Sequence, residues 1–161
     1  MLARKLIEGF AGGQVAGGGA SYRYWRIYIT ALNAGGSAVG IAEVELRTTV
    51  GGADQTTSAT PVLESSYAMN GEGSYYPGAS TIDGNTSTYW ISSIYAPLTQ
   101  FIRYDLTTQQ AIVQVAIYPY DASANCPRDF KIQGSNDGVN FTDVKSFTSV
   151  AAWTGWQVIN L

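Results

Sequence analysis

From Tyr22 onward, hydrophobic and polar residues alternate with a period of two along several short segments. In YRYWRIYIT, which begins at Tyr22, the side chains of Trp25, Ile27 and Ile29 fall on one side. The same alternation occurs in two further segments, IAEVELR (41–47) and QFIRYDL (100–106). Because successive side chains of a strand point to opposite faces, this pattern predicts half-buried β-strands.

Three more segments complete the predicted set of strands. AIVQVAIYPY (111–120) is almost wholly apolar, as expected of a central strand buried on both faces. DFKIQGSNDGVNFTDVKSF (129–147) predicts a hairpin, because Asn-Asp-Gly tolerates the positive φ angles of a tight turn. GWQVINL (155–161) predicts a last strand. About seven short strands without a long helical pattern predict an all-β fold, an antiparallel jelly-roll β-sandwich.

The first twenty residues differ from the rest and are assigned to a separate segment, 1–20, before a sandwich domain at 21–161. Leucine and phenylalanine recur at every fourth position from Leu2 to Phe10, which predicts about two helical turns. Five glycines within residues 11–20 leave the backbone there nearly unrestrained. Two interpretations stay open. The segment is a disordered tail, or it is a flexible tether behind a short anchor peptide that docks through Leu2, Leu6, Ile7 and Phe10.

Composition narrows the classes of function. Only 13% of the 161 residues are charged, against roughly 25% in typical proteins, which suits work outside a cell or inside a large assembly. The net charge of −3 and scattered basic residues argue against a nucleic acid partner. The chain has no histidine and one cysteine, so it lacks the commonest general base and any intrachain disulfide. No segment has the apolar length of a secretory signal or a membrane span, so we expect no membrane insertion.

Four parts of the chain carry a resemblance to a known family: YWRIYITALNAGGSAVGIAEVEL, STIDGNTSTYW, QFIRYDL, and VAIYP with CPRDFKIQGSNDGVNFTDV. Together they resemble the discoidin-like family, the coagulation factor V/VIII type C domains, which are close to galactose-type carbohydrate-binding modules. The resemblance extends over nearly all of residues 22–161. It implies a jelly-roll sandwich whose end loops bind sugars, phospholipid headgroups or protein partners.

The order of these segments differs from that of the family. In most members, the segment resembling YWRIYI…IAEVEL forms the last pair of strands, whereas here it comes first. Joining Leu161 to Ser21 would restore the usual order, so the chain resembles a circular permutant, as is feasible where domain termini lie close together. The alternative is that residues 22–47 swap into a neighbouring copy of an oligomer. Closure within one chain is the preferred interpretation.

The segment TIDGNTSTYW (81–90) is the candidate metal site. In the carbohydrate-binding relatives, a similar loop holds a structural calcium ion with help from an Ala-Glu pair. The matching residues are Asp83, Asn85, Thr88, Ala42 and Glu43, with the backbone of Ile82. Calcium takes about six to eight oxygen ligands, which these groups offer. The alternative is an ordinary Asp-Gly turn with Glu43 solvated on its strand. The Ala-Glu match favours Ca²⁺.

A sugar site would need an aromatic platform beside groups that bond hydroxyls. Eight residues expected in loops are candidates: Tyr75, Tyr76, Tyr95, Tyr120, Asp121, Asn125, Arg128 and Trp153. The alternative for each aromatic ring taken alone is packing in the core. The alternative for Arg128 is an ion pair with Asp129 or Asp121, or structural stacking on a tyrosine. Galactose-binding relatives often use a histidine, which this chain lacks.

These features predict a non-enzymatic structural protein of a bacteriophage virion, a fibre, decoration or tail-tip component in the extracellular particle. Its partners would be other virion proteins through the N-terminal segment, further copies of itself, and host cell-surface polysaccharide bound weakly and multivalently. The alternative is a carbohydrate-binding module of a secreted glycoside hydrolase or of a bacterial adhesin. No pair of carboxylates is marked by spacing or context as catalytic.

Overall fold

The computed structural model describes residues 5–6, 19–33, 35–69, 75–121, 124–151 and 153–161. One sheet contains β1 (Lys5–Leu6), β3 (Gly40–Arg47), β5 (Trp90–Ile91), β7 (Gln114–Pro119) and β10 (Gln157–Asn160). The other contains β2 (Tyr22–Leu32), β4 (Val62–Glu64), β6 (Gln100–Gln110), β8 (Pro127–Ser135) and β9 (Thr142–Phe147). One short 3₁₀ helix, η1 (Gly78–Thr81), leads into the candidate metal loop.

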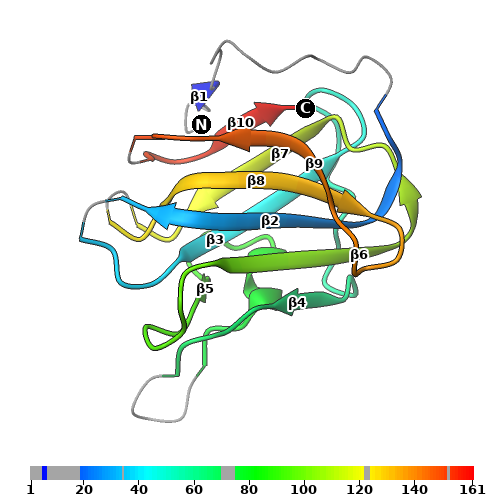
Figure 1. Ribbon diagram of the computed structural model, residues 1–161. Helices are drawn as coiled ribbons and strands as arrows, with labels where there is room; N and C mark the ends of the chain where they lie inside the picture. Colours follow the sequence, from blue (N-terminus) through cyan, green and yellow to red (C-terminus); the bar gives the residue numbers. More distant parts are fainter. Residues whose placement is uncertain (1–4, 7–18, 34, 70–74, 122–123, 152) are drawn as a thin grey trace.

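The two sheets pack face to face, with strand orders β1-β10-β7-β3-β5 and β4-β6-β2-β8-β9 (Figure 1). The pairings between strands are antiparallel, apart from that of β1 with β10. The expected all-β sandwich is therefore confirmed, including the β8–β9 hairpin. The alternation did not predict β1, β4 and β5, because strands of two or three residues are too short to show a period.

The apolar side chains of the alternating strands fill the space between the sheets. Trp25, Ile27 and Ile29 of β2 are at most 1% exposed, and Ile102 and Tyr104 of β6 are fully buried. Each such side chain contributes about 1.5–3 kcal/mol by leaving water. The predicted inward faces of these two strands are confirmed.

Strand β3 is buried on both of its faces. Its polar residues Glu43 and Arg47 are only 4% and 3% exposed. Arg47 donates a hydrogen bond to Gln114 Oε1 (2.8 Å) and forms an ion pair with Glu45. The alternating pattern alone indicates one polar face here, and the loops packed over that face are what bury it.

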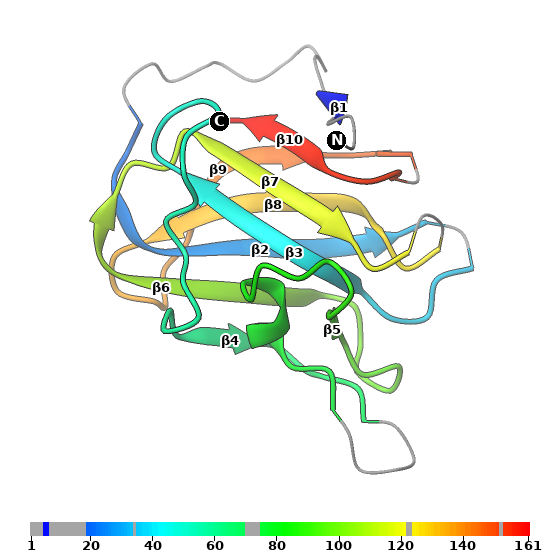
Figure 2. The same ribbon diagram turned by 180° about the vertical axis from the view of Figure 1, so that it is seen from behind.

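Residues 22–47 complete the sandwich of their own chain. Strand β2 lies between β6 and β8, and β3 lies between β7 and β5. The two ends of the sandwich also meet, because the N–H of Leu161 donates to the carbonyl oxygen of Val113 (2.9 Å) and Gly19 lies beside Val113 (Figure 2). The structure thus has the closure within one chain that the sequence favours.

The N-terminal segment is described only at Lys5 and Leu6. These residues form a strand parallel to β10, with Lys5 opposite Gln157 and Leu6 opposite Val158. The expected helical turns are therefore wrong at these two positions, where pairing with an open sheet edge satisfies the backbone. The other anchor candidates, Leu2, Ile7 and Phe10, lie outside the described residues. Among the residues described, no helix has the length and apolar character needed to cross a membrane.

Candidate functional site

The loop after η1 folds around the carboxylate of Asp83. Asp83 Oδ1 accepts a hydrogen bond from the Asn85 N–H (2.9 Å), and its Oδ2 accepts one from the Thr88 hydroxyl (2.7 Å). Gly84 between them has a φ angle of +76°, which an L side chain would strain. The turn predicted from the Asp-Gly sequence is thus present, and it already brings three of the candidate ligands together.

Glu43 reaches this loop from β3. Its Oε2 accepts a hydrogen bond from the same Asn85 N–H (3.1 Å). Burial raises the pKa of Glu43 to about 7. The hydrogen bonds from the Gly84 and Asn85 N–H groups favour the charged form and lower this pKa, but the effect of burial is larger. None of the ion pairs among the described residues involves Glu43. The alternative in which Glu43 is simply solvated is therefore wrong.

Strand pairing explains why Glu43 and the loop meet. The pairing of β3 with β7 shifts register between Ile41 and Glu43, which leaves Ala42 as the extra residue of a bulge. Ile41 pairs with Pro119 of β7 on one side and with Trp90 of β5 on the other, and Trp90 directly follows the loop. Trp90 is fully buried and its Nε1 donates to Ser66 O (2.8 Å), so the end of the loop is fixed to the sandwich.

An open hollow of about 410 Å³ adjoins the loop and is lined in part by the carboxylates of Glu43, Glu45, Asp54 and Asp83. Glu45 is paired with Arg47, and Asp54 Oδ1 accepts the N–H of Leu46 (2.8 Å). In the described part of the chain, no group of three or more His, Cys, Asp or Glu side chains is placed to hold a metal ion. A cation here would need a mixed set of oxygens.

The remaining candidate ligands fit such a mixed set. Ala42 and Ile82 are buried and apolar, so they offer only backbone carbonyl oxygens, and the bulge leaves Ala42 without a partner on β7. Together with the Glu43 and Asp83 carboxylates and the Thr88 hydroxyl, these are the hard oxygen donors that calcium prefers.

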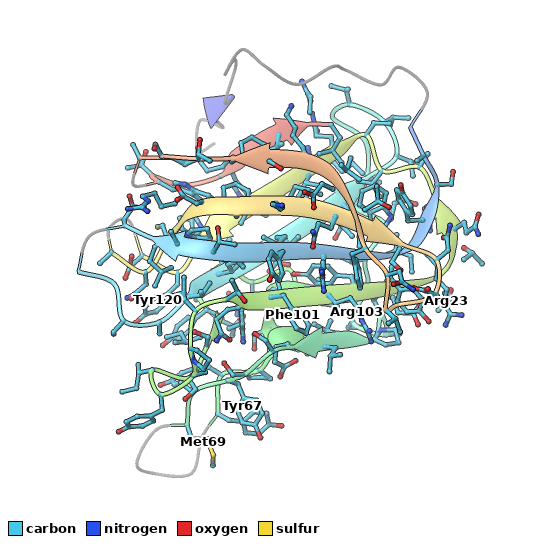
Figure 3. The ribbon with its side chains drawn as sticks, viewed as in Figure 1. Arg23, Tyr67, Met69, Phe101, Arg103 and Tyr120 are labelled. Carbon is cyan, nitrogen blue, oxygen red and sulfur yellow. The ribbon has the colours of Figure 1, made fainter. Side chains whose placement is uncertain are left out.

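Aromatic and apolar side chains project from two loops at one end of the sandwich. They are Tyr67 (46% exposed), Met69 (65%), Tyr75 (58%), Ile94 (56%), Tyr95 (91%) and Leu98 (46%), here called the aromatic loop surface. Figure 3 shows Tyr67 and Met69 projecting below the sheets, away from the core. The loops are joined by bonds from the Ser93 N–H to Ser66 Oγ (3.1 Å) and from the Ala68 N–H to Ile91 O (2.7 Å).

A second group of tyrosines forms a continuous row. The rings of Tyr76 and Tyr89 stack with their centres 5.1 Å apart, and Tyr89 lies 4.3 Å from Tyr120. Burial raises the pKa of Tyr89, and the two neighbouring tyrosines raise it further. Tyr120 keeps 38% of its surface exposed, so the row is open to solvent at that ring.

The sequence profile of the F5/8 type C domain family matches residues 57–161. The chain belongs to the F5/8 type C domain family. The match contains β4 to β10 and leaves β2 and β3 outside it, although both strands complete the same sandwich. No curated protein and no solved structure matches the chain. F5/8 type C domains are generally non-catalytic binding domains, often for carbohydrate or protein.

The structure shows which sugar-binding candidates of this F5/8 type C domain are exposed and which are buried or engaged in ion pairs. The expectation that Trp153 belongs to a sugar-binding platform is wrong. Trp153 is only 2% exposed and packs edge-on against Phe130, with 5.6 Å between the ring centres, so it is a core residue. Arg128 forms an ion pair with Asp129 (3.1 Å), the alternative given for it.

Asp121 and Asn125 lie together in the F5/8 type C fold, joined by a bond from Asn125 Nδ2 to Asp121 Oδ2 (2.8 Å). They follow Tyr120 in the chain and place polar groups near the end of the tyrosine row. Sequence reasoning missed Tyr67, Met69, Tyr89, Ile94 and Leu98. Single apolar residues in a loop carry no periodic signal, so only the folded loops show which of them are exposed.

Proposed function

We propose that this F5/8 type C domain is a non-enzymatic binding module whose ligand end is the aromatic loop surface. The observation that carries the proposal is the exposure of six large apolar side chains on two adjoining loops. Contiguous exposed apolar patches are rare on soluble domains and mark interaction sites. Tyr95, with 91% of its surface exposed, is the principal contact.

The ligand proposed for this surface is a host cell-surface glycan. Aromatic rings offer flat faces to the C–H groups of sugars. The Asp121–Asn125 pair beside Tyr120, at the end of the tyrosine row, offers partners for sugar hydroxyls. The side chains of this surface are largely exposed, which suits weak binding at each site. Several copies acting together would raise the overall affinity by orders of magnitude, about 10²–10⁴.

The setting proposed for the module is a bacteriophage virion, as a fibre, decoration or tail-tip component. The low charge of the chain and its glycine-rich stretch before the sandwich support this setting. Residues 1–20 would contact other virion proteins, and the domain would occur in several copies. The alternative setting is a carbohydrate-binding module of a secreted glycoside hydrolase or adhesin, which the family membership also suits.

A structural calcium ion is part of the proposal. The buried Glu43 carboxylate without a cationic partner supports it, because a buried charge is costly unless it is paired. Asp83, Thr88 and the carbonyl groups of Ala42 and Ile82 would complete the donor set, with Asn85 holding the turn. The ion would brace the loop against β3 and take no part in a reaction.

The order of strands is proposed to be a circular permutation of the usual family order. Leu161 and Gly19 both lie against Val113, so a short link could join the two ends of the sandwich. The family match, which begins only at residue 57, supports this origin for β2 and β3.

A glycan array probed with the multimerised protein tests the binding proposal. We expect signal on host polysaccharide, with a loss of at least about tenfold in Tyr95→Ala, since an aromatic anchor at a hot spot contributes about 2 kcal/mol or more. Val139→Ala is the matched control, because Val139 is 79% exposed in the β8–β9 turn and lies outside the aromatic loop surface.

Absence of signal on every glycan would overturn the glycan proposal, and an equal effect of Val139→Ala would overturn the role of the aromatic loop surface. The setting is tested separately. Location of the coding gene among capsid or tail genes supports the virion, and location beside glycoside hydrolase or adhesin genes supports the alternative.

A further inference from the structure

Two arginines stand opposite each other on the outer face of the second sheet. Arg26 of β2 pairs in register with Arg103 of β6, and both strands turn their alternate residues away from the core at these positions. Figure 3 shows Arg103 and Phe101 on this open face. Like charges placed directly across neighbouring strands repel each other, so this arrangement destabilises the sheet unless something offsets it.

Among the described residues, no carboxylate forms an ion pair with either of these two arginines, here called the arginine pair. Arg26 Nε donates to the neutral Gln133 Oε1 (2.6 Å), and Arg103 Nη1 donates to the carbonyl oxygen of Gly138 (3.2 Å). Arg103 Nε is buried without any partner. A guanidinium has five N–H donors, and these two bonds occupy one donor on each arginine.

The nearby acids are engaged with other cations. Asp105 accepts two bonds from Arg23, each 2.8 Å long. Asp143 is paired with Lys131 (2.6 Å). Both carboxylates still attract the arginine pair, Asp143 acting on Arg26 and Asp105 on Arg103, but neither pairs with it directly.

Aromatic rings hold both guanidinium groups in place. The centre of Arg26 lies 3.7 Å from the ring of Phe141, 4.8 Å from that of Tyr28 and 5.5 Å from that of Phe101. Arg103 lies 5.1 Å from the ring of Tyr24. A stacked guanidinium keeps its N–H edges free and loses little freedom when an anion binds, so the pair is preorganised.

Burial lowers the pKa of Arg26, and the neighbouring charge of Arg103 lowers it further, while Tyr28 and Asp143 act in the opposite direction. The guanidinium stays charged at neutral pH because its ordinary pKa is so high. An anion between the two arginines would relieve their mutual repulsion. It would also replace part of the hydration that burial removes from the Arg26 guanidinium.

We propose that the arginine pair binds the carboxylate or sulfate groups of an acidic polysaccharide that lies across the outer face of the second sheet. On the same face, the neighbouring cross-strand pair is Tyr28 with Phe101, which lies about 7 Å from the arginine pair along the strands. A sugar chain crossing the face would meet charge in one row and aromatic rings in the other.

Charge favours a polysaccharide over a nucleic acid. Proteins that bind a phosphate backbone typically neutralise about six to ten phosphates, whereas the arginine pair supplies two cations on a chain of net charge −3. The site is distinct from the aromatic loop surface and does not depend on the function proposed for that surface.

Affinity electrophoresis of the full chain in gels containing polygalacturonate, dextran sulfate or neutral dextran tests the proposal. We expect retardation by at least one acidic polymer and none by dextran, and the polymer that retards the protein identifies carboxylate or sulfate as the group bound. Retardation should weaken as salt is raised. Arg26→Gln and Arg103→Gln should each weaken binding about tenfold or more, because each removes charged hydrogen bonds.

Lys145→Gln is the matched control. It removes one positive charge from the same sheet, where Lys145 donates to Asn160 O, and should leave retardation within about twofold. Arg26→Lys and Arg103→Lys keep the charge and lose the planar fork, so they should fall between wild type and the glutamine variants even if a glutamine variant fails to fold. Lack of retardation by both acidic polymers, an equal loss in Lys145→Gln, or binding to single-stranded DNA alone would overturn the proposal.

Discussion

At the scale of single residues, Glu43 is the side chain whose surroundings depart most from those of an ordinary surface acid. It is 4% exposed, it accepts backbone N–H groups from the loop at 84–85, and no cation pairs with it among the described residues. Without a bound cation the group lowers the cost of burial by holding a proton, which is why its pKa rises to about 7. Its protonation and any metal bound beside it are therefore linked.

In chelator-treated protein, we expect the free energy of unfolding to fall as the pH is raised from about 4.5 to about 7. The pKa of Glu43 rises from 4.5 to about 7 on folding, so the folded state keeps a proton that the unfolded state has lost. The stability that this proton contributes is fully present below about pH 4.5 and is lost as the pH rises through about 7. It amounts to at most about 3 kcal/mol. Urea unfolding across this range measures it. Glu43→Gln should lose this part of the pH dependence, and an unchanged profile would contradict the assignment.

Calcium should raise the melting temperature of the wild-type protein at pH 8, where Glu43 is ionised. An ion that binds only the folded state contributes about 2.7 kcal/mol at a concentration one hundred times its Kd. Glu43→Gln and Asp83→Asn should each abolish the response. Differential scanning calorimetry with and without a chelator provides the measurement, and identical curves for wild type at every calcium concentration would remove the proposed ion.

At the scale of elements, close contacts between strands depend on particular small residues. Gly134 of β8 lies directly against the ring of Tyr22, where an added Cβ would stand only 2.0 Å from a ring carbon. The Tyr22 ring in turn packs edge-on against Trp25 (5.4 Å), the largest core side chain of β2. The glycine therefore lets the start of β2 pack closely on β8.

Gly134→Ala should lower the free energy of unfolding by about 1–3 kcal/mol, the usual cost of forcing an extra carbon into a filled space. Chemical denaturation followed by tryptophan fluorescence measures the change. Gly19→Ala is the control, because a Cβ there would make only ordinary contacts, and it should stay within about 0.5 kcal/mol of wild type. Equal stability of wild type and Gly134→Ala would show that Tyr22 can move aside freely.

At the scale of the whole molecule, the two ends of the sandwich meet beside Val113, and residues 22–47 occupy interior positions in both sheets. The strands that come first in the chain therefore lie inside the sandwich and do not extend it at an edge. The two proposed binding surfaces lie apart on this body, one on the loops at its end and one on the open face of the second sheet (Figures 1 and 3).

A variant with Leu161 linked to Ser21 by a short glycine-serine linker, and opened between Ser58 and Ala59, should fold to the same sandwich. Both residues at the new opening are exposed in a turn, and exposed turns tolerate new termini well. Its melting temperature should lie within about 8 °C of the parent, equivalent to ~1–2 kcal/mol for a domain of this size. Opening the linked chain between Ala116 and Ile117, inside the buried β7, should prevent folding. Unfolding of the Ser58–Ala59 variant as well would contradict the proposed equivalence of the two orders.

The local pattern of the sequence was sufficient to predict the longer strands, the inward faces of β2 and β6, and the β8–β9 hairpin. These features depend on side-chain alternation and turn residues a few positions apart, which the chain carries locally. The resemblance to the family also predicted that Glu43 lies beside the candidate metal loop. The calcium ion itself stays a prediction.

Only the tertiary structure decided which side chains share an environment. It buried Trp153 and left Tyr95 exposed, it covered the polar face of β3, and it placed Arg26 opposite Arg103. Each of these outcomes depends on the register and neighbours of strands far apart in the chain, which a period of two does not contain. The sequence by itself therefore determined the sandwich and its candidate residues, and long-range pairing determined which of those residues are exposed and which are buried.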